Sequence, residues 1–225
     1  MKGPKDGIIK VKSKYGESFK TKDKSGIYLV SVGKKYHEGA FLEASLEFMD
    51  QNFEKYQLVL ADTLQRHNYL DYDKEKLNYE LALQEGNLWL ARNIHITSRF
   101  SNLTFSRWDD WLTHSLYPQK RKELDTLYDT HPQIRTAFRN TALSFLAKKY
   151  DITESNIQSS VEYLKEECSI IAPIWSVEKV NKVVYPGDIT PAIQIVYDYY
   201  DRGNYKDYAA WLPISFKCYS ILENV

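Results

Sequence analysis

The chain has 225 residues, with 30 basic and 30 acidic side chains, so its net charge is zero and its bulk charge indicates no polyanionic partner. A hydrophobic content of 43% is enough to bury one full core, and we expect a single domain over 1–225. Two cysteines exclude a disulfide framework and a thiolate zinc cluster, and no apolar run approaches the ~20 residues of a membrane span. Without the apolar core of a signal peptide, we expect a cytoplasmic protein that binds no metal.

The first 25 residues are rich in lysine, with eight lysines against three acidic residues. Charge runs of this kind are usually solvated, so we expect 1–25 to be a basic, flexible segment. The same charges are also suited to contact phosphate groups.

Two buried strands flank the first predicted helix. Residues 26–33 and 57–62 have the continuous apolar pattern of buried strands. From about Gly39 a helical pattern places Leu42, Leu46 and Met49 on one apolar face. Strand, helix and strand in this order are typical of a parallel βαβ unit.

The remaining pattern predicts mostly helices. A long helix from 71 to about 94 has an apolar side of leucines and one alanine, at 77, 81, 88 and 91, and 97–116 reads as irregular and aromatic. Further helices are predicted at 119–129, 132–149, 154–168 and 191–201, and strands at 183–185 and 211–218. We therefore expect an α/β fold, a Rossmann-like and mostly parallel sheet with helices on both faces.

Ser31 lies near the end of the first predicted strand. Ligands of open parallel sheets bind at the carboxyl ends of the strands, near the point where the strand order reverses. The next helix begins about eight residues later, so its N-terminal amides would lie close to the hydroxyl. Strand alternation puts Ile27 and Leu29 on the same face, where they would wall the same pocket. Most strand serines are structural, so position alone makes Ser31 only a candidate nucleophile.

Three more side chains are candidates for chemistry. Tyr163 and Glu167 are four residues apart on a predicted helix and therefore share a face. A phenol and a carboxylate that converge can hold an ammonium group, although a plain surface pair has the same spacing. Tyr185, which precedes Pro186 at a predicted strand end, could relay a proton or simply pack.

Together these short motifs resemble the cyclodipeptide synthase family over about residues 26–195. The run Ser31-Val-Gly-Lys-Lys-Tyr36, the segment Tyr163-Leu-Lys-Glu-Glu167 and the strand end Tyr185-Pro186 occur in the family's order and spacing. Asp62-Thr63 and Thr190-Pro191 also agree. Lys34, Tyr185 and Pro186 are similar to the subgroup marked by Tyr-Pro, often called XYP.

The resemblance implies a fold similar to the catalytic domain of class I tyrosyl- and tryptophanyl-tRNA synthetases. It implies an aminoacyltransferase of secondary metabolism that joins residues from two aminoacyl-tRNAs into a cyclic dipeptide, a diketopiperazine. A ping-pong mechanism would pass through aminoacyl- and dipeptidyl-enzyme intermediates on Ser31, with Tyr163 and Glu167 holding the amino group and Tyr185 assisting proton transfer. Since the ester is already activated, no cofactor is implied, and no ATP motif occurs. We expect a monomer.

The resemblance also implies the surroundings of the site. The implied pocket residues are Ile27, Leu29, Gly33, Tyr36, Asp62, Ile170 and Pro186. Relatives carry a basic helix for tRNA after the second strand, whereas 72–94 holds three basic residues against four acidic ones. The candidates for tRNA contact are therefore the lysine-rich N-terminus and Lys34, Lys35, Lys120, Arg121 and Lys122.

Two alternatives remain open. A serine hydrolase or esterase on an α/β sheet could pair Ser31 with one of the five histidines, at 37, 67, 95, 114 and 131. Against it, Ser31 lacks the GxSxG elbow of such enzymes. A non-catalytic tRNA-binding module is the second alternative, and the presence of Ser31 with Tyr163, Glu167 and Tyr185 counts against it.

Overall fold

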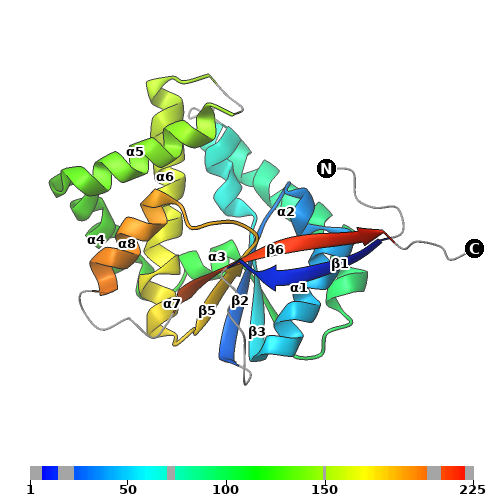
Figure 1. Cartoon of the computed structure of the whole chain (residues 1–225). Helices are drawn as coiled ribbons and strands as arrows, with labels where there is room; N and C mark the ends of the chain where they lie inside the picture. Colours follow the sequence, from blue (N-terminus) through cyan, green and yellow to red (C-terminus); the bar gives the residue numbers. More distant parts are fainter. Residues whose placement is uncertain (1–6, 15–22, 70–73, 149–150, 202–208, 221–225) are drawn as a thin grey trace, which may run out of the picture.

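The structure, a computed structural model, is built on one sheet with the strand order β1-β6-β5-β2-β3-β4 (Figure 1). It describes residues 7–14, 23–69, 74–148, 151–201 and 209–220. The strands are β1 (Gly7–Ser13), β2 (Asp23–Ser31), β3 (Phe53–Ala61), β4 (Leu103–Arg107), β5 (Lys182–Tyr185) and β6 (Ala210–Ser220). All neighbours pair in parallel except β1 with β6, which confirms the predicted, mostly parallel sheet.

Helices cover both faces of the sheet. The α-helices are α1 (Gly39–Asn52), α2 (Glu75–Thr97), α3 (Trp108–Leu112), α4 (Tyr117–Thr130), α5 (Pro132–Leu146), α6 (Glu154–Ile171), α7 (Pro173–Val177) and α8 (Pro191–Asp201). Two short 3-10 helices follow strand ends, η1 (Lys35–His37) after β2 and η2 (Thr63–Tyr69) after β3. Thr153 caps the start of α6, because its side-chain hydroxyl accepts a hydrogen bond from the Asn156 amide.

The alternation of side chains along β2 divides the core in two. Ile27 and Leu29 pack on one face, in a cluster that includes residues of α4, α5, α6, α7 and α8. Tyr28 and Val30 pack on the other face, against α1 and α2. Because Ser31 continues the first series, its side chain belongs to the face that α6 covers.

Helix α2 reverses the face that its sequence predicts. Leu77, Leu81 and Leu88, expected on the apolar side, are 47%, 39% and 44% exposed. The buried side consists instead of Asn78, Ala82, Gly86, Trp89, Asn93 and Ile96. Small residues at 82 and 86 let the helix backbone approach the end of β3, which a row of leucines would prevent.

Two segments expected to be irregular form regular structure. Residues 7–13, expected within a flexible tail, form β1 because their backbone pairs in antiparallel fashion with the long strand β6. Residues 1–6 and 15–22 lie outside the described residues. The aromatic stretch 97–116 contains β4 and α3. Strand β4 is a short edge strand in which the consecutive residues Thr104 and Phe105 are both exposed, so it lacks the alternating pattern by which a strand is predicted. No helix in the described part of the chain is long and apolar enough to cross a membrane.

Candidate active site

Ser31 lies at the point where the strand order of the sheet reverses. From β2 the chain builds outward through β3 and β4, and then returns to add β5 on the other side of β2. Ser31 ends β2 and Tyr185 ends β5, so both side chains stand at the crevice between the two strands. Ser31 Oγ lies 3.3 Å from Tyr185 Oη, within hydrogen-bonding distance, and Ser31 is 5% exposed.

A second phenol supports Tyr185. Tyr36 Oη lies 3.3 Å from Tyr185 Oη, and the two rings meet edge to face. Burial, with Tyr36 as the next cause, raises the pKa of Tyr185 well above its ordinary value. Tyr185 therefore keeps its proton, and the row from Ser31 through Tyr185 to Tyr36 can pass a proton along hydrogen bonds.

Helix α6 brings Tyr163 and Glu167 to the same crevice. Both line the cavity that Ser31 and Tyr185 also line. Burial raises the pKa of Glu167 to about 8, and the Glu167 side chain is 8% exposed. Burial raises the pKa of Tyr163 well above its ordinary value, and the nearby Glu167 carboxyl group adds to the rise. The helical spacing thus places a carboxyl group with a pKa of about 8 and a neutral phenol in the cavity that Ser31 lines.

The cavity has a volume of about 550 Å³. Its walls come from the end of β2, from η2, α2, α5, α6 and α8, and from Trp211 of β6. Apolar lining residues include Leu81, Ala142, Phe145, Leu164 and Ile193. Such a site has room for a small ligand with apolar side chains, held by a few polar groups at one end.

The pocket residues implied by resemblance are placed unequally. Gly33 lines the cavity and has a φ of 82°, a backbone conformation that glycine adopts without strain. Ile27, Leu29 and Ile170 lie in the apolar core and do not line the cavity. Tyr36 reaches the site through Tyr185, and Pro186 is half-buried without lining it.

Asp62 is held away from the cavity by an ion pair. Arg107 Nε donates to Asp62 Oδ2 at 2.7 Å, and Arg107 Nη2 donates to the same oxygen. Burial raises the pKa of Asp62, although the Arg107 contact opposes the rise. Asp62 therefore ties the end of β3 to the end of β4.

The predicted tRNA-contacting residues are dispersed. Lys34 lines the cavity and Lys35 is exposed beside it. On α4, Lys120 donates to Glu123 at 2.9 Å, and Arg121 is paired with Asp125 and Glu162. Lys122 is exposed on the same helix. In the Lys120-Arg-Lys122 cluster, Lys120 and Arg121 are thus already paired with neighbouring carboxylates.

No histidine lines the described cavity. His37, the nearest to Ser31 in sequence, is fully buried, and its Nδ1 lies 3.2 Å from Tyr28 Oη. Burial lowers the pKa of His37 to about 3. The partner of Ser31 is the Tyr185 phenol, which is not the arrangement of a Ser-His hydrolase.

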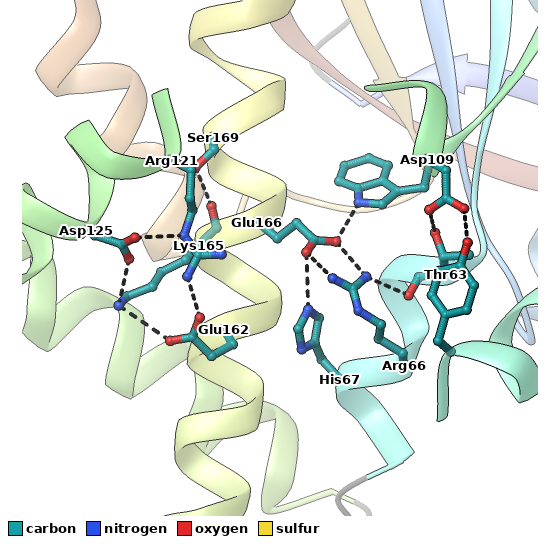
Figure 2. A network of polar contacts seen from close by, with 12 residues as sticks. Thr63, Arg66, His67, Asp109, Arg121, Asp125, Glu162, Lys165, Glu166 and Ser169 are labelled. Carbon is teal, nitrogen blue, oxygen red and sulfur yellow. Dashed lines mark hydrogen bonds and ion pairs between the residues drawn. The ribbon is translucent and has the colours of Figure 1, made fainter. Parts of the chain in front are cut away.

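A buried carboxylate beside the site was not anticipated from the sequence (Figure 2). Glu166 accepts a bond from Arg66 Nη1 at 2.9 Å and one from Trp108 Nε1 at 2.8 Å, and His67 Nε2 lies 3.4 Å away. Burial opposes ionisation, but His67 and Arg66 hold the pKa of Glu166 down at about 2. This cluster fastens η2, which supplies Gln65 and Asn68 to the cavity, to α6.

The opposite side of α6 is fastened to α4. Figure 2 shows Lys165 between Asp125 and Glu162, at 3.0 Å and 3.5 Å. The Lys165 ammonium also lies 4.4 Å from the centre of the Tyr128 ring. Contacts on both sides leave α6 little freedom to rotate, so Tyr163 and Glu167 point into the cavity.

Other lining residues on α6 could have been found by their spacing. Ser160 lies three residues before Tyr163 and Leu164 three residues before Glu167, so both fall on the face that the Tyr163–Glu167 pair already defines. The lining residues on α5 and α8, such as Thr141 and Ile193, could not be predicted from the sequence, because only the packing of helices far apart in the chain brings them to the cavity. Among the described residues, no group of three or more histidine, cysteine or acidic side chains could hold a metal ion.

Comparison with known proteins identifies the fold through structure alone. No family model and no curated protein matches the sequence. A solved cyclodipeptide synthase from Fluoribacter dumoffii is similar with a TM-score of 0.88 at 24% identity, covering 95% of this chain and 100% of that one. A cyclodipeptide synthase from Candidatus Glomeribacter gigasporarum, solved with Phe-tRNA bound, has a TM-score of 0.65 at 17% identity, covering 92% of each chain.

The fold also extends to the synthetases. A tyrosyl-tRNA synthetase from Archaeoglobus fulgidus, solved with tyrosine, is similar with a TM-score of 0.50 at 14% identity, covering 88% of this chain and 55% of that one. The predicted likeness to the class I tyrosyl enzymes is thereby confirmed. The chain has the fold of the cyclodipeptide synthases.

Proposed function

We propose that this protein is a cyclodipeptide synthase that joins two aminoacyl groups from aminoacyl-tRNAs, and that it belongs to the Tyr-Pro subgroup. One observation carries the proposal. On the fold of these enzymes, Ser31 is hydrogen-bonded to Tyr185 in a cavity that Tyr163 and Glu167 also line. The Phe-tRNA bound to the relative from Candidatus Glomeribacter gigasporarum supports aminoacyl-tRNA as the substrate. Lys34 and Tyr185-Pro186 support the subgroup.

The first transfer makes an ester on Ser31. Ser31 Oγ attacks the ester carbonyl of the first aminoacyl-tRNA, and the bond from that carbonyl to the ribose oxygen breaks. The serine proton leaves as the Oγ–carbon bond forms, and the ribose oxygen gains a proton. Tyr185, 3.3 Å from Ser31 Oγ, can take part in both transfers while keeping its own proton overall.

Tyr163 and Glu167 then hold the amino group of the bound residue. An α-ammonium group near Glu167 favours the ionised carboxylate, so binding lowers the raised pKa of Glu167 and releases a proton. The carboxylate formed by this release can then take a proton from the ammonium, which becomes the amine nucleophile.

Two further steps form the ring. The free amine attacks the ester of a second aminoacyl-tRNA, which forms a peptide bond, frees the second tRNA and leaves a dipeptidyl ester on Ser31. The new terminal amine attacks that ester, which closes the diketopiperazine and restores the serine hydroxyl. Holding amine and ester in one small cavity replaces an encounter in solution, an effect on the order of 7 kcal/mol or more.

The test is a product assay with aminoacyl-tRNAs. We expect wild type to release diketopiperazines, detected by mass spectrometry, and Ser31→Ala to release none. Ser144→Ala, at an exposed position on α5, is the matched control and should equal wild type. Equal yields from wild type and Ser31→Ala would refute the proposal, as would the absence of any product from a full set of aminoacyl-tRNAs.

The same samples separate the two alternatives. A serine hydrolase would react with a fluorophosphonate at Ser31 and turn over simple esters without making cyclic dipeptides. A binding module would slow the migration of tRNA in a gel, and Ser31→Ala would leave its affinity for tRNA unchanged.

A further inference from the structure

The ribbon of β1 and β6 has one apolar and one basic face. On the inner face, Val11 lies opposite Phe216, and Phe216 meets the Phe41 ring of α1 edge to face. Strand alternation therefore turns the neighbouring residues outward. The outer face consists of Lys10, Lys12 and Lys14 on β1 and the adjoining turn, with Ser215, Lys217 and Tyr219 on β6. We call this outer face the lysine ribbon.

Positive charge on the lysine ribbon is not balanced within it. Residues 7–14 and 209–220 contain no aspartate or glutamate. Lys10 lies directly opposite Lys217, a cross-strand arrangement in which like charges repel. The Lys10 ammonium lies 5.6 Å from the centre of the exposed Tyr219 ring. A polyanion lying across both strands would relieve the repulsion, and the exposed ring offers a surface for a sugar or base.

The lysine ribbon begins at the rim of the active-site cavity. Lys14 Nζ lies 2.7 Å from Asp188 Oδ2, and Asp188 lines the cavity. Trp211, at the start of β6, lines it as well. At about 3.4 Å per residue, Lys10 lies ~14 Å along the strand from Lys14, with one lysine every ~7 Å. The basic face thus runs outward from the cavity along β1 and β6, which lie side by side in Figure 1.

The part of the rim that α2 forms is unsuited to phosphates. There α2 supplies Leu81 and Glu85 to the cavity, its exposed surface also bears Glu75 and Glu80, and its Lys76 lies 4.0 Å from Glu80. Arg92, near the end of α2, is paired with Glu38. An RNA whose 3′ end lies in the cavity would meet negative charge on this side and positive charge on the ribbon.

We propose that the lysine ribbon binds the sugar–phosphate backbone of the tRNA whose aminoacylated 3′ end enters the cavity, an inference that rests on the proposed function. The contacts are to phosphates, so they are indifferent to sequence and to the amino acid carried. This accounts for how one site can accept two different aminoacyl-tRNAs in succession.

The experiment compares two triple variants in binding of unacylated bulk tRNA across a salt series. In the ribbon variant, Lys10, Lys12 and Lys217 become glutamine. In the control, the exposed Lys55, Lys148 and Lys179 become glutamine, which removes the same charge elsewhere. We expect the ribbon variant to bind about tenfold or more weakly near 0.1 M salt, with the slope of log affinity against log salt reduced by roughly 2, since each lost phosphate contact removes 0.7 to 0.9. The control should stay within about twofold of wild type.

A second measurement separates RNA binding from chemistry. Acylation of Ser31 by a small aminoacyl thioester, which carries no RNA, should proceed at the wild-type rate in the ribbon variant. Removing the Lys10–Lys217 repulsion should leave the thermal midpoint equal or higher; if the triple variant fails to fold, Lys217→Gln alone should still reduce the slope by roughly 0.9.

The outcomes keep the two proposals apart. Wild-type affinity and slope in the ribbon variant overturn the ribbon inference while leaving the synthase activity intact, as does an equal loss in the control. If wild type binds tRNA through the ribbon but makes no cyclic dipeptide, the proposed function fails and the RNA surface stands.

Discussion

Glu166 and Glu167 are adjacent carboxyl groups with opposite properties. Arg66 and His67 face Glu166, and these contacts hold its pKa at about 2 despite burial. Glu167 projects into the cavity, and burial raises its pKa to about 8. The pKa values of these two neighbouring carboxyl groups are shifted in opposite directions, so the groups serve different purposes. Glu166 fixes the helix, and Glu167 exchanges protons.

Glu167→Gln should change how stability depends on pH. The folded-state pKa of Glu167 lies above its ordinary value, so the folded protein binds this proton more tightly than the unfolded chain. The stability linked to the proton is complete below about pH 4.5 and is lost as pH rises through about 8, by up to about 1.4 kcal/mol per pH unit. We expect Glu167→Gln to match wild type at pH 4 and to exceed it at pH 9.

Denaturant unfolding at pH 4, 7 and 9 measures this difference. Glu47→Gln, at an exposed position on α1, is the control and should run parallel to wild type. A Glu167→Gln curve that also runs parallel to wild type would mean that Glu167 is ionised in the empty site.

At the scale of elements, the Glu166 cluster joins two walls of the cavity. It fixes η2 to α6, and these two elements carry Gln65, Tyr163 and Glu167. Since Glu166 is buried and meets three partners, its removal leaves the buried Arg66 guanidinium without its ion-pair partner.

Glu166→Gln should therefore destabilise the fold by about 3–5 kcal/mol at neutral pH. The folded-state pKa of Glu166 is depressed, so its stabilisation is present above about pH 4.5 and lost as pH falls through about 2. We expect the gap between variant and wild type to narrow between pH 5 and pH 2.5. Unfolding midpoints over that range measure it, and a gap independent of pH would contradict the ion-pair account.

Helix α2 depends on a glycine at its closest approach to the sheet. A Cβ atom at Gly86 would collide with the Asp62 carboxylate and with Arg107. Both groups are fixed by their mutual ion pair and cannot move apart cheaply.

Gly86→Ala should thus lower the free energy of unfolding by about 1–3 kcal/mol, although alanine favours helix by about 1 kcal/mol. Gln84→Ala, exposed on the same helix, should be neutral or slightly stabilising. Urea unfolding of both variants tests the packing, and a stabilised Gly86→Ala would show that α2 does not press on Asp62.

At the scale of the whole molecule, the balance of 30 basic and 30 acidic residues hides a local asymmetry. The lysine ribbon gathers positive charge at one part of the cavity rim, while α2 brings acidic residues to another part. With no net charge near neutral pH, molecules repel one another weakly.

We expect solubility to be lowest near pH 7 and to rise on either side. Changing the exposed Lys55 and Lys148 to glutamate lowers the net charge by four and should move the minimum to a lower pH. Turbidity against precipitant concentration from pH 5 to pH 9 measures both, and an unmoved minimum would mean that local patches dominate self-association.

Patterns local in the sequence determined much of the architecture. The apolar runs of β2 and β3 and the face of α1 predicted the parallel unit, because buried strands and amphipathic helices have distinct periods. The same periods placed Ser31 on the face of Ile27 and Leu29, and Tyr163 with Glu167 on one helix face. These features depend only on side chains a few residues apart.

Only the tertiary structure decided which partners these residues meet. The contact of Ser31 with Tyr185 joins positions 154 residues apart, and the charge of Glu166 depends on Arg66, 100 residues away. The buried face of α2 contradicted its hydrophobic pattern, since backbone approach at Gly86 outweighed the burial of its leucines. Strand β1 likewise could not be predicted from its own residues, because its hydrogen-bonding partner β6 lies at the far end of the chain. Period and propensity are local properties, whereas a cavity, a buried charge and a sheet edge exist only where distant segments pack together.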